Sequence, residues 1–141
     1  MTTPYAEDVN FWLTGRSDPT RWIESTKRQI ETLGGTVEAE AFGSDATGRA
    51  AFMVGFSIQN DRFKIVWPVL TSKRGQTSAA RIQAATMLYH YVKSVCLYAI
   101  IVGARTAFLT HLVLPDGRTA SQAADAELAD AIPAMLLLSG G

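Results

Sequence analysis

The feature that most constrains this fold is a helix-length run from Ser78 to Val102, which follows three strand-like segments. At 100° per residue, one face of this helix carries Ala85, Leu88, Val92, Val95, Cys96 and Ala99. Beyond Val95 the helix is apolar on every side, because Leu97 and Ile101 fall where polar residues stood earlier. Such a helix must be covered all round, so we expect the C-terminal segment or another subunit to pack against it.

A shorter helix is predicted near the N-terminus, in the stretch SDPTRWIESTKRQIETLGG. Ser17 or Asp18 can cap its start, and Pro19 suits the first helical turn. Gly34-Gly35 suits the left-handed exit that ends many helices. Residues 1–16 before it are expected to form an irregular arm, with Phe11, Trp12 and Leu13 as its anchor.

Three strands are predicted between the two helices, at 36–42, 49–59 and 62–70. In the first strand, alternation places Val37, Ala39 and Ala41 on one face. The second strand is apolar on both faces and is expected to be central. Pro68 cannot donate to a ladder, so the third strand should reach a sheet edge or its own end there. The order predicts an antiparallel meander.

These elements define an α+β fold with an α–β–β–β–α core, in which a three-stranded antiparallel meander packs on a long helix and short helices follow. One domain of 141 residues is expected, with an arm at 1–16, the core at 17–102 and a C-terminal helical extension at 103–141. Gly103 should end the long helix, and LPDGRT should form a tight turn.

The cellular setting is predicted from cysteine usage and the termini. Cys96 is the single cysteine, which fits a reducing cytoplasm, and its place on the apolar stripe indicates a packed thiol. The first residues show no signal-peptide pattern. The uncharged stretch between Lys93 and Arg105 has 11 residues, short of the ~20 that a membrane-spanning helix needs. We expect a cytoplasmic protein without a membrane partner.

Charge is distributed unevenly, although the net charge is zero. From Arg62 to Arg105 the sequence has seven basic residues and no Asp or Glu. The residues before and after this block are net acidic. The block predicts either a surface for an anionic partner or cations that acidic neighbours neutralise in the fold.

Catalytic and metal-binding patterns are not recognisable in this sequence. The histidines, His90 and His111, are not in an HExxH motif, and no cysteine pair exists. No GxSxG elbow or dinucleotide fingerprint is present. We therefore expect a non-enzymatic protein with no cofactor, no metal site and no catalytic residue.

The loop KRGQTS is the strongest candidate site. It stands between a strand and a helix and partly resembles a P-loop, but it lacks the first glycine and the Gly-Lys-Ser/Thr order. The N–H groups at a helix N-terminus favour phosphate oxygens, and repeated backbone phosphates suit these cations better than one nucleotide does. The nucleic-acid-binding residues predicted are Arg62, Lys64, Lys73, Arg74, Thr77, Ser78, Arg81, Lys93 and, as a base-stacking ring, Tyr91. The alternative is a solvated basic turn.

The C-terminal region THLVLPDGRTASQAADAELADAIPAMLLLSGG resembles the ending of a family of small uncharacterised proteins from phages and mobile elements, in which an LPDGRT turn precedes a helix and an apolar close. The resemblance is clearest at 111–119 and 132–141. It implies a mobile-element context and no particular reaction.

Two further resemblances bear on nucleic acid. SKRGQTSAARIQAA is similar to the sequence that opens the last helix of double-stranded-RNA-binding domains, with Lys73 and Arg74 at the positions of the paired lysines. Thr77 or its neighbour stands where a third lysine is usual. Phage single-strand annealing proteins also share a β–β–β–α order and a basic groove, and often form rings, which is a similarity of topology alone.

The sequence therefore predicts a phage or mobile-element accessory protein that binds nucleic acid, single-stranded DNA rather than duplex, and forms a homo-oligomer. The alternative is a structural or adaptor protein, in which the apolar helix end and the C-terminal tail form a protein–protein interface.

Overall fold

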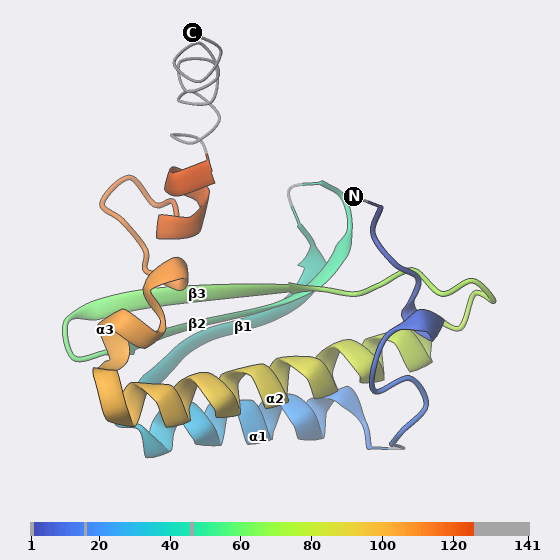
Figure 1. The fold of residues 1–141 in the computed structure, drawn as a ribbon, viewed down its shortest axis with the longest axis horizontal. Helices are drawn as coiled ribbons and strands as arrows, with labels where there is room; N and C mark the ends of the chain where they lie inside the picture. The colour runs from blue at the N-terminus through green and yellow to red at the C-terminus, as the bar shows by residue number, and fades with distance from the viewer. Residues whose placement is uncertain (1, 16, 46, 126–141) are drawn as a thin grey trace, which may run out of the picture.

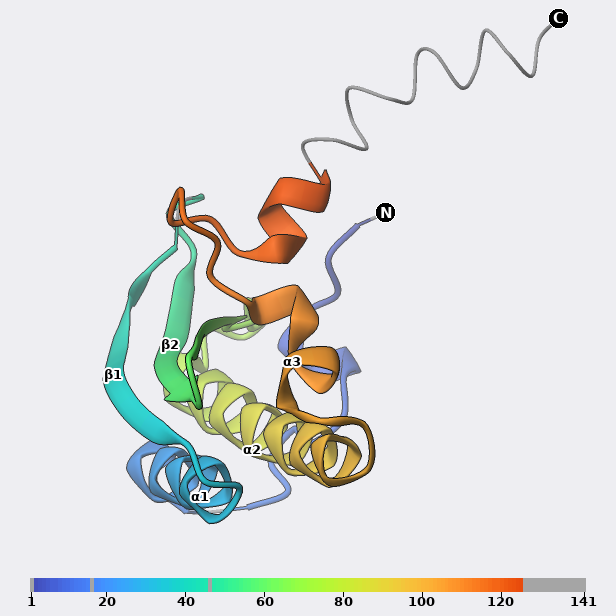
Figure 2. The same ribbon diagram turned by 90° about the vertical axis from the view of Figure 1, so that its left-hand side faces the viewer.

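The computed structural model describes residues 2–15, 17–45 and 47–125, and its elements confirm the predicted α+β fold. A three-stranded antiparallel sheet in the order β1-β2-β3 packs on two helices, which lie on the same face of the sheet (Figures 1 and 2). The elements are η1 (Ala6–Asp8), α1 (Pro19–Thr32), β1 (Thr36–Ser44), β2 (Ala50–Ile58), β3 (Asp61–Pro68), α2 (Thr77–Val102), α3 (Ala104–Ala107) and η2 (Leu109–His111).

The core lies between the sheet and α2. β2 is the central strand, as its doubly apolar pattern predicts, and its even-numbered residues from Phe52 to Ile58 are buried. Phe56 is paired with Phe63 and Val54 with Ile65 across the β2–β3 ladder. The helical side of this core is formed by Ala80, Ala84, Ala85, Leu88, Val92, Cys96 and Ala99, all of them buried. Pro68 ends β3, as predicted.

The ends of α1 follow from local sequence chemistry. The backbone N–H of Thr20 donates to Asp18 Oδ1 at 2.9 Å, so Asp18 is the N-cap. The sequence alone allowed either Ser17 or Asp18 in this role. After the helix, Gly34 adopts a φ of 100°, which favours glycine. Gly35 has no room for a side chain, because an added Cβ would lie 2.7 Å from Ile30 Cγ2.

One prediction about β1 is wrong. A β-bulge between Val37 and Ala39 interrupts the alternation, so Val37 pairs with Phe56 but Glu40 pairs with Val54. Because paired residues share a face, Ala39 lies on the face turned away from the helices. Glu40 lies on the helix side instead, where Lys27 Nζ donates to it at 3.3 Å. The bulge also turns Phe42 toward the helices, beside Phe52.

The long helix runs over Thr77–Val102 and ends at Gly103, with a φ of 93°, as predicted. By length and composition alone, α2 is apolar enough to cross a membrane, although one of its faces, from Ala80 to Ala99, is buried in the core of this fold. Its last turns remain exposed, with Leu97 65%, Ile100 73% and Ile101 77% accessible. Within the described part of the chain, the segment that follows α2 leaves these residues uncovered.

The segment after α2 returns to the sheet edge. Phe108 is fully buried against Phe56 and Phe63, and the backbone N–H of Val113 donates to Arg62 O on β3 at 2.8 Å. The predicted LPDGRT turn forms, with a hydrogen bond from Gly117 N to Leu114 O at 2.9 Å. The predicted apolar tail, IPAMLLLSGG, lies outside the described residues.

The N-terminal arm is anchored in part as predicted. Trp12 packs against the core and the Phe11 ring stacks on His90 at 4.8 Å, but Leu13 is 65% exposed and Ala6 is fully buried. The amide of Gln83, on α2, is itself buried and donates to the carbonyls of Ala6, Val9 and Asn10 at 2.8, 3.2 and 3.0 Å. Thus a polar contact between arm and helix replaces part of the apolar anchor expected there.

Candidate nucleic-acid interface

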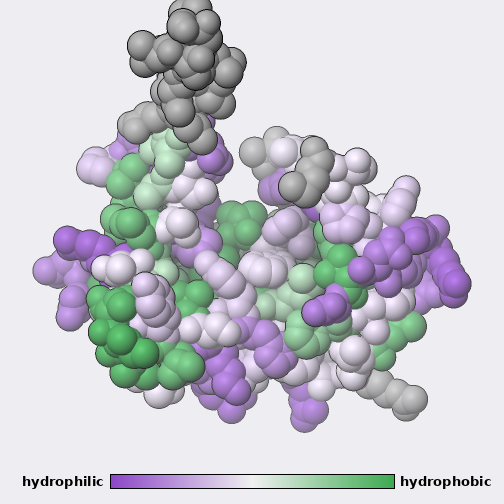
Figure 3. Space-filling model, viewed as in Figure 1, coloured by the Kyte–Doolittle hydropathy of each residue, from purple (hydrophilic) through white to green (hydrophobic). Residues whose placement is uncertain are grey.

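The candidate interface is the basic end of the molecule, which we define as loop 71–76 and the first turns of α2. This end lies at the opposite end of α2 from α3 (Figure 1), and its surface over the loop is strongly hydrophilic (Figure 3). Lys73, Arg74, Thr77 and Ser78 are all exposed here and close in sequence. With Arg81, on the second turn of α2, the structure therefore places five of the nine predicted residues at this end.

The loop is organised by a carboxylate from the N-terminal arm. Glu7 accepts hydrogen bonds from Ser72 Oγ at 2.7 Å, from Lys73 N at 2.9 Å and from Arg74 N at 3.2 Å. Desolvation alone would raise the pKa of Glu7, but these hydrogen bonds lower it to about 2. The N–H groups that precede α2 thus already bind an oxyanion, which belongs to the chain itself.

The cations of the loop differ in their partners. Lys73 Nζ lies 2.9 Å from Asp8 Oδ2 and 5.5 Å from the centre of the Tyr5 ring. Arg74 forms no ion pair within the described ranges. Two acidic residues of the arm therefore neutralise part of the basic end, and the guanidinium of Arg74 stays open to solvent.

Arg81 belongs to the same end but faces the sheet. Its guanidinium lies 4.3 Å from the centre of the Phe42 ring, a cation–π distance. Phe42 reaches this position only because the bulge in β1 turns it to the helix side. Tyr5, which lies beside Lys73, is 47% exposed, and Phe42, which lies beside Arg81, is 40% exposed. Each of these two cations therefore has an accessible aromatic ring next to it.

Three predicted cations lie elsewhere, so a single continuous track of the six predicted cations does not form. Arg62 and Lys64 pair with Ser57 and Gly55 on the sheet face turned away from the helices, and Arg62 Nε lies 3.6 Å from Glu38 Oε2. Lys93 is on α2, with Nζ 5.9 Å from the Tyr89 ring. The alternation of β3 separates the first two from the helical layer, because Phe63 and Ile65 occupy the inner face.

Tyr91 is not presented for base stacking, contrary to the prediction. It is half-buried between α2 and β3, with its ring 5.2 Å from that of Trp67 and its hydroxyl 2.6 Å from His111 Nε2. Burial raises the pKa of Tyr91 and lowers that of His111. A neutral His111 can then accept the tyrosine proton in a hydrogen bond, so the pair is part of the packing.

A reactive cysteine or a cluster of metal ligands would indicate catalysis. Cys96 is buried, its Sγ lies 3.7 Å from Gln29 O, and burial raises its pKa to about 11. A thiol with that pKa is not a nucleophile at neutral pH. Among the residues that the structure describes, no three His, Cys, Asp or Glu side chains gather as metal ligands do.

Sequence reasoning missed Glu7, Asp8, Tyr5 and Phe42. Glu7 and Asp8 lie 65 or more residues from the loop that they contact, so no local pattern joins them. The sequence signal for these contacts is the block from Arg62 to Arg105, which has no Asp or Glu. Any carboxylate that pairs with the cations of this block must therefore come from another part of the chain.

The geometry thus defines an α+β fold with a small basic end flanked by two exposed aromatic rings, those of Tyr5 and Phe42. Comparisons with protein-family models, with curated proteins and with solved structures found no match.

Proposed function

We propose that this protein is a non-enzymatic accessory protein that binds nucleic acid, preferentially single-stranded DNA, in the cytoplasm of a phage or mobile-element host. The observation that carries the proposal is the exposed cluster of Lys73, Arg74, Thr77 and Ser78 on a loop that Glu7 holds in shape through two backbone N–H groups and one hydroxyl. Exposed cations and hydroxyl donors are the groups that bind backbone phosphates.

The sugar–phosphate backbone would bind the side chains around this loop, while Glu7 keeps the loop in shape. Arg74 supplies a cation without a carboxylate partner among the described residues, and Thr77 and Ser78 add hydroxyl donors. Because Glu7 already holds the backbone, the loop is organised before a ligand arrives, which lowers the entropic cost of binding.

Single-stranded DNA fits this end better than a duplex. Bases stack on exposed rings, and Tyr5 and Phe42 each stand beside a cation, namely Lys73 and Arg81. In a duplex the bases are paired and stacked on one another, so their faces are not available to these rings without unstacking. A flexible strand can bend to place phosphates on the cations and bases on the rings.

The experiment is a titration of fluorescent single-stranded DNA, duplex DNA and RNA by anisotropy at several salt concentrations. The logarithm of the affinity for the single strand should fall with the logarithm of salt by about 0.7 per neutralised phosphate. K73A/R74A should flatten that slope by roughly one to two units. The matched control is R21A/R28A, which removes two exposed arginines from α1. The proposal fails if the chain does not bind DNA at low salt, or if both double variants behave alike.

A second candidate function is a structural or adaptor role, which the exposure of Leu97, Ile100 and Ile101 favours. An adaptor would capture a protein partner through this apolar helix end and leave nucleic acid unbound. The anisotropy titration separates the two, because only the first proposal predicts salt-dependent binding.

A further inference from the structure

The last turns of α2 present an apolar surface that the described fold leaves open. We call this surface the apolar end face, and its residues are Leu97, Tyr98, Ile100, Ile101, Val102 and Leu109, which are 65, 51, 73, 77, 36 and 50% exposed. It forms the strongly hydrophobic region at the left of Figure 3, at the far end of α2 from loop 71–76. No charged residue lies between Lys93 and Arg105 in the sequence.

This amount of apolar exposure is unusual for a helix that packs on only one side. Leu97, Ile100 and Ile101 lie within about 100° of one another around the α2 axis and together expose on the order of 400 Å², about half of the ~800 Å² that each partner of a stable complex contributes. Tyr98, Val102 and Leu109 extend the apolar surface around the end of the helix. Isolated exposed apolar residues need no explanation, but a contiguous patch of this size marks an interaction surface.

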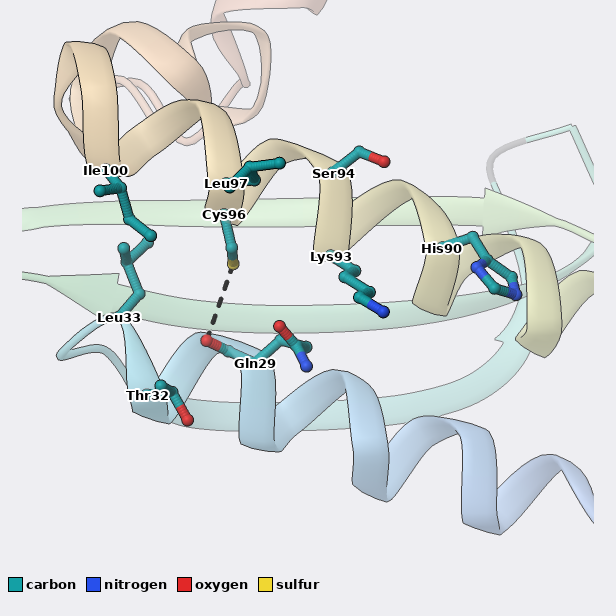
Figure 4. Close-up of a pocket in the computed structure, with 9 residues that line it drawn as sticks. All are labelled: Gln29, Thr32, Leu33, His90, Lys93, Ser94, Cys96, Leu97 and Ile100. Carbon is teal, nitrogen blue, oxygen red and sulfur yellow. Dashed lines mark hydrogen bonds between the residues drawn. The ribbon is translucent and has the colours of Figure 1, made fainter.

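The apolar end face adjoins a groove between α1 and α2 (Figure 4). The groove has a volume of about 670 Å³, and Leu33 of α1 lines it together with Leu97 and Ile100 of α2. The face therefore combines protruding side chains with a receiving groove, and two residues contribute to both. A surface with both features can pair with a copy of itself around a twofold axis.

The charges around the face also favour a second copy in an antiparallel arrangement. The last turn of α2 carries no basic residue, although the carbonyls at a helix C-terminus attract cations. Lys93 precedes Leu97 by four residues, or about one helical turn. If two α2 helices cross antiparallel about an axis at Leu97, Lys93 of each copy lies opposite Ile101 of the other, in the turn that lacks a cation. Arg105 is already paired with Asp61, at 2.8 Å.

We infer that the apolar end face binds a second copy of this chain through antiparallel pairing of the α2 helices about Leu97. The inference goes beyond nucleic-acid binding and does not depend on it. If both hold, the two basic ends lie at the outer ends of the dimer, about 60 Å apart, because residues 77–97 span about 30 Å of helix in each copy. One long DNA strand could then engage both ends.

The test is the oligomeric state of the full-length protein, measured by light scattering after gel filtration over about a hundredfold range of concentration. We expect a dimer that dissociates on dilution. The variant L97E/I101E should raise the dimer Kd by about a hundredfold or more, because it puts four carboxylates into the interface. L13E is the matched control, since Leu13 and Leu97 are equally exposed at 65%.

Oxidative cross-linking tests the axis. Leu97→Cys should form a disulfide dimer, whereas Leu13→Cys should not, and the buried Cys96 should stay reduced in both. The inference is wrong if the wild-type chain stays monomeric at every concentration, or if L97E/I101E leaves the dimer unchanged. If the protein is a monomer that binds lipid vesicles, the apolar end face is a membrane-binding surface. If it is a monomer in which Leu97→Cys does not react with thiol reagents, the face is covered by the chain's own C-terminal tail. If L97E/I101E still binds DNA with an unchanged salt slope per site, nucleic-acid binding does not require the dimer, and the two proposals are independent of each other.

Discussion

Glu7 and Ser72 are 65 residues apart in the sequence, yet the hydroxyl of Ser72 donates to the carboxylate of Glu7 at 2.7 Å. The same carboxylate accepts from the backbone N–H groups of Lys73 and Arg74. This relationship makes the arm a structural part of the basic end, because the loop conformation depends on a group that lies outside the loop.

Replacing Glu7 with Gln should loosen the loop. The neutral amide is a weaker acceptor than a carboxylate, so the N–H groups of Lys73 and Arg74 should exchange with solvent faster and the melting temperature should fall. Hydrogen exchange by NMR and thermal unfolding measure these effects. Asp8→Asn is the control, because Asp8 contacts the side chain of Lys73 and no backbone N–H of the loop is bonded to it.

The difference between wild type and E7Q should depend on pH. The folded pKa of Glu7 is about 2, below its ordinary value of 4.5, so the stabilisation is complete above pH 4.5 and is lost as the pH falls toward 2. Denaturation at several pH values should show the two proteins converging in that window. A difference that persists at the acid end would mean that the charge of Glu7 does not cause it.

Replacing Gln83 with Leu should destabilise the protein by about 3 kcal/mol, since three buried or part-buried carbonyls would lose their shared donor. Urea denaturation measures the change in the free energy of unfolding. Gln76→Leu provides the comparison, because Gln76 is exposed at the start of α2 and its side chain forms no hydrogen bond within the described residues. Equal losses in the two variants would contradict the role given to Gln83.

Removing the exposed rings should weaken single-stranded DNA binding. Tyr5→Ala and Phe42→Ala should each cost about 1–3 kcal/mol of binding free energy, with little change in the salt slope, because stacking involves no counterion release. Tyr91→Leu, which removes the ring, should leave binding unchanged, and Tyr91→Phe should lower stability by about 1 kcal/mol, since it removes the hydrogen bond to His111. If Tyr91→Leu weakened binding as much as Tyr5→Ala, the assignment of the rings would be reversed.

His111 should make stability depend on pH in a different range. Burial lowers its pKa below the ordinary 6.5, and a hydrogen bond to the Lys64 backbone opposes that shift. The folded state favours the neutral ring, so its contribution is complete above pH 6.5 and is lost as the pH falls through the folded pKa. His111→Gln, which cannot titrate, should show a flatter stability profile between pH 7 and pH 5 in thermal unfolding.

Much of the fold could be predicted because its signals are local. The cap at Asp18, the glycine at 103 and the doubly apolar β2 act within a few residues, and each appears where the pattern places it. The faces of β1 could not be predicted, because a bulge adds one residue at Glu38 without a composition signal and reverses the alternation after it.

The candidate site was predictable only in part. Residues 73–78 were found because they are adjacent in the sequence and open a helix. Tyr91 was misplaced because helical periodicity describes one face of α2 and leaves out β3 and His111, which cover another. The partners from the arm depend on contacts across more than 60 residues, which no window of sequence contains.

The hold of Gln83 on the arm also has a consequence for the order of folding. Ala6, Val9 and Asn10 leave the ribosome before Gln83, whose amide binds their carbonyls and is synthesised 73 to 77 residues later. Closing a loop of that length carries an entropic cost that is repaid only once α2 is in place on the sheet. The arm, although synthesised before α2, should therefore reach its native position only after α2 has packed on the sheet, and the basic end should form together with it.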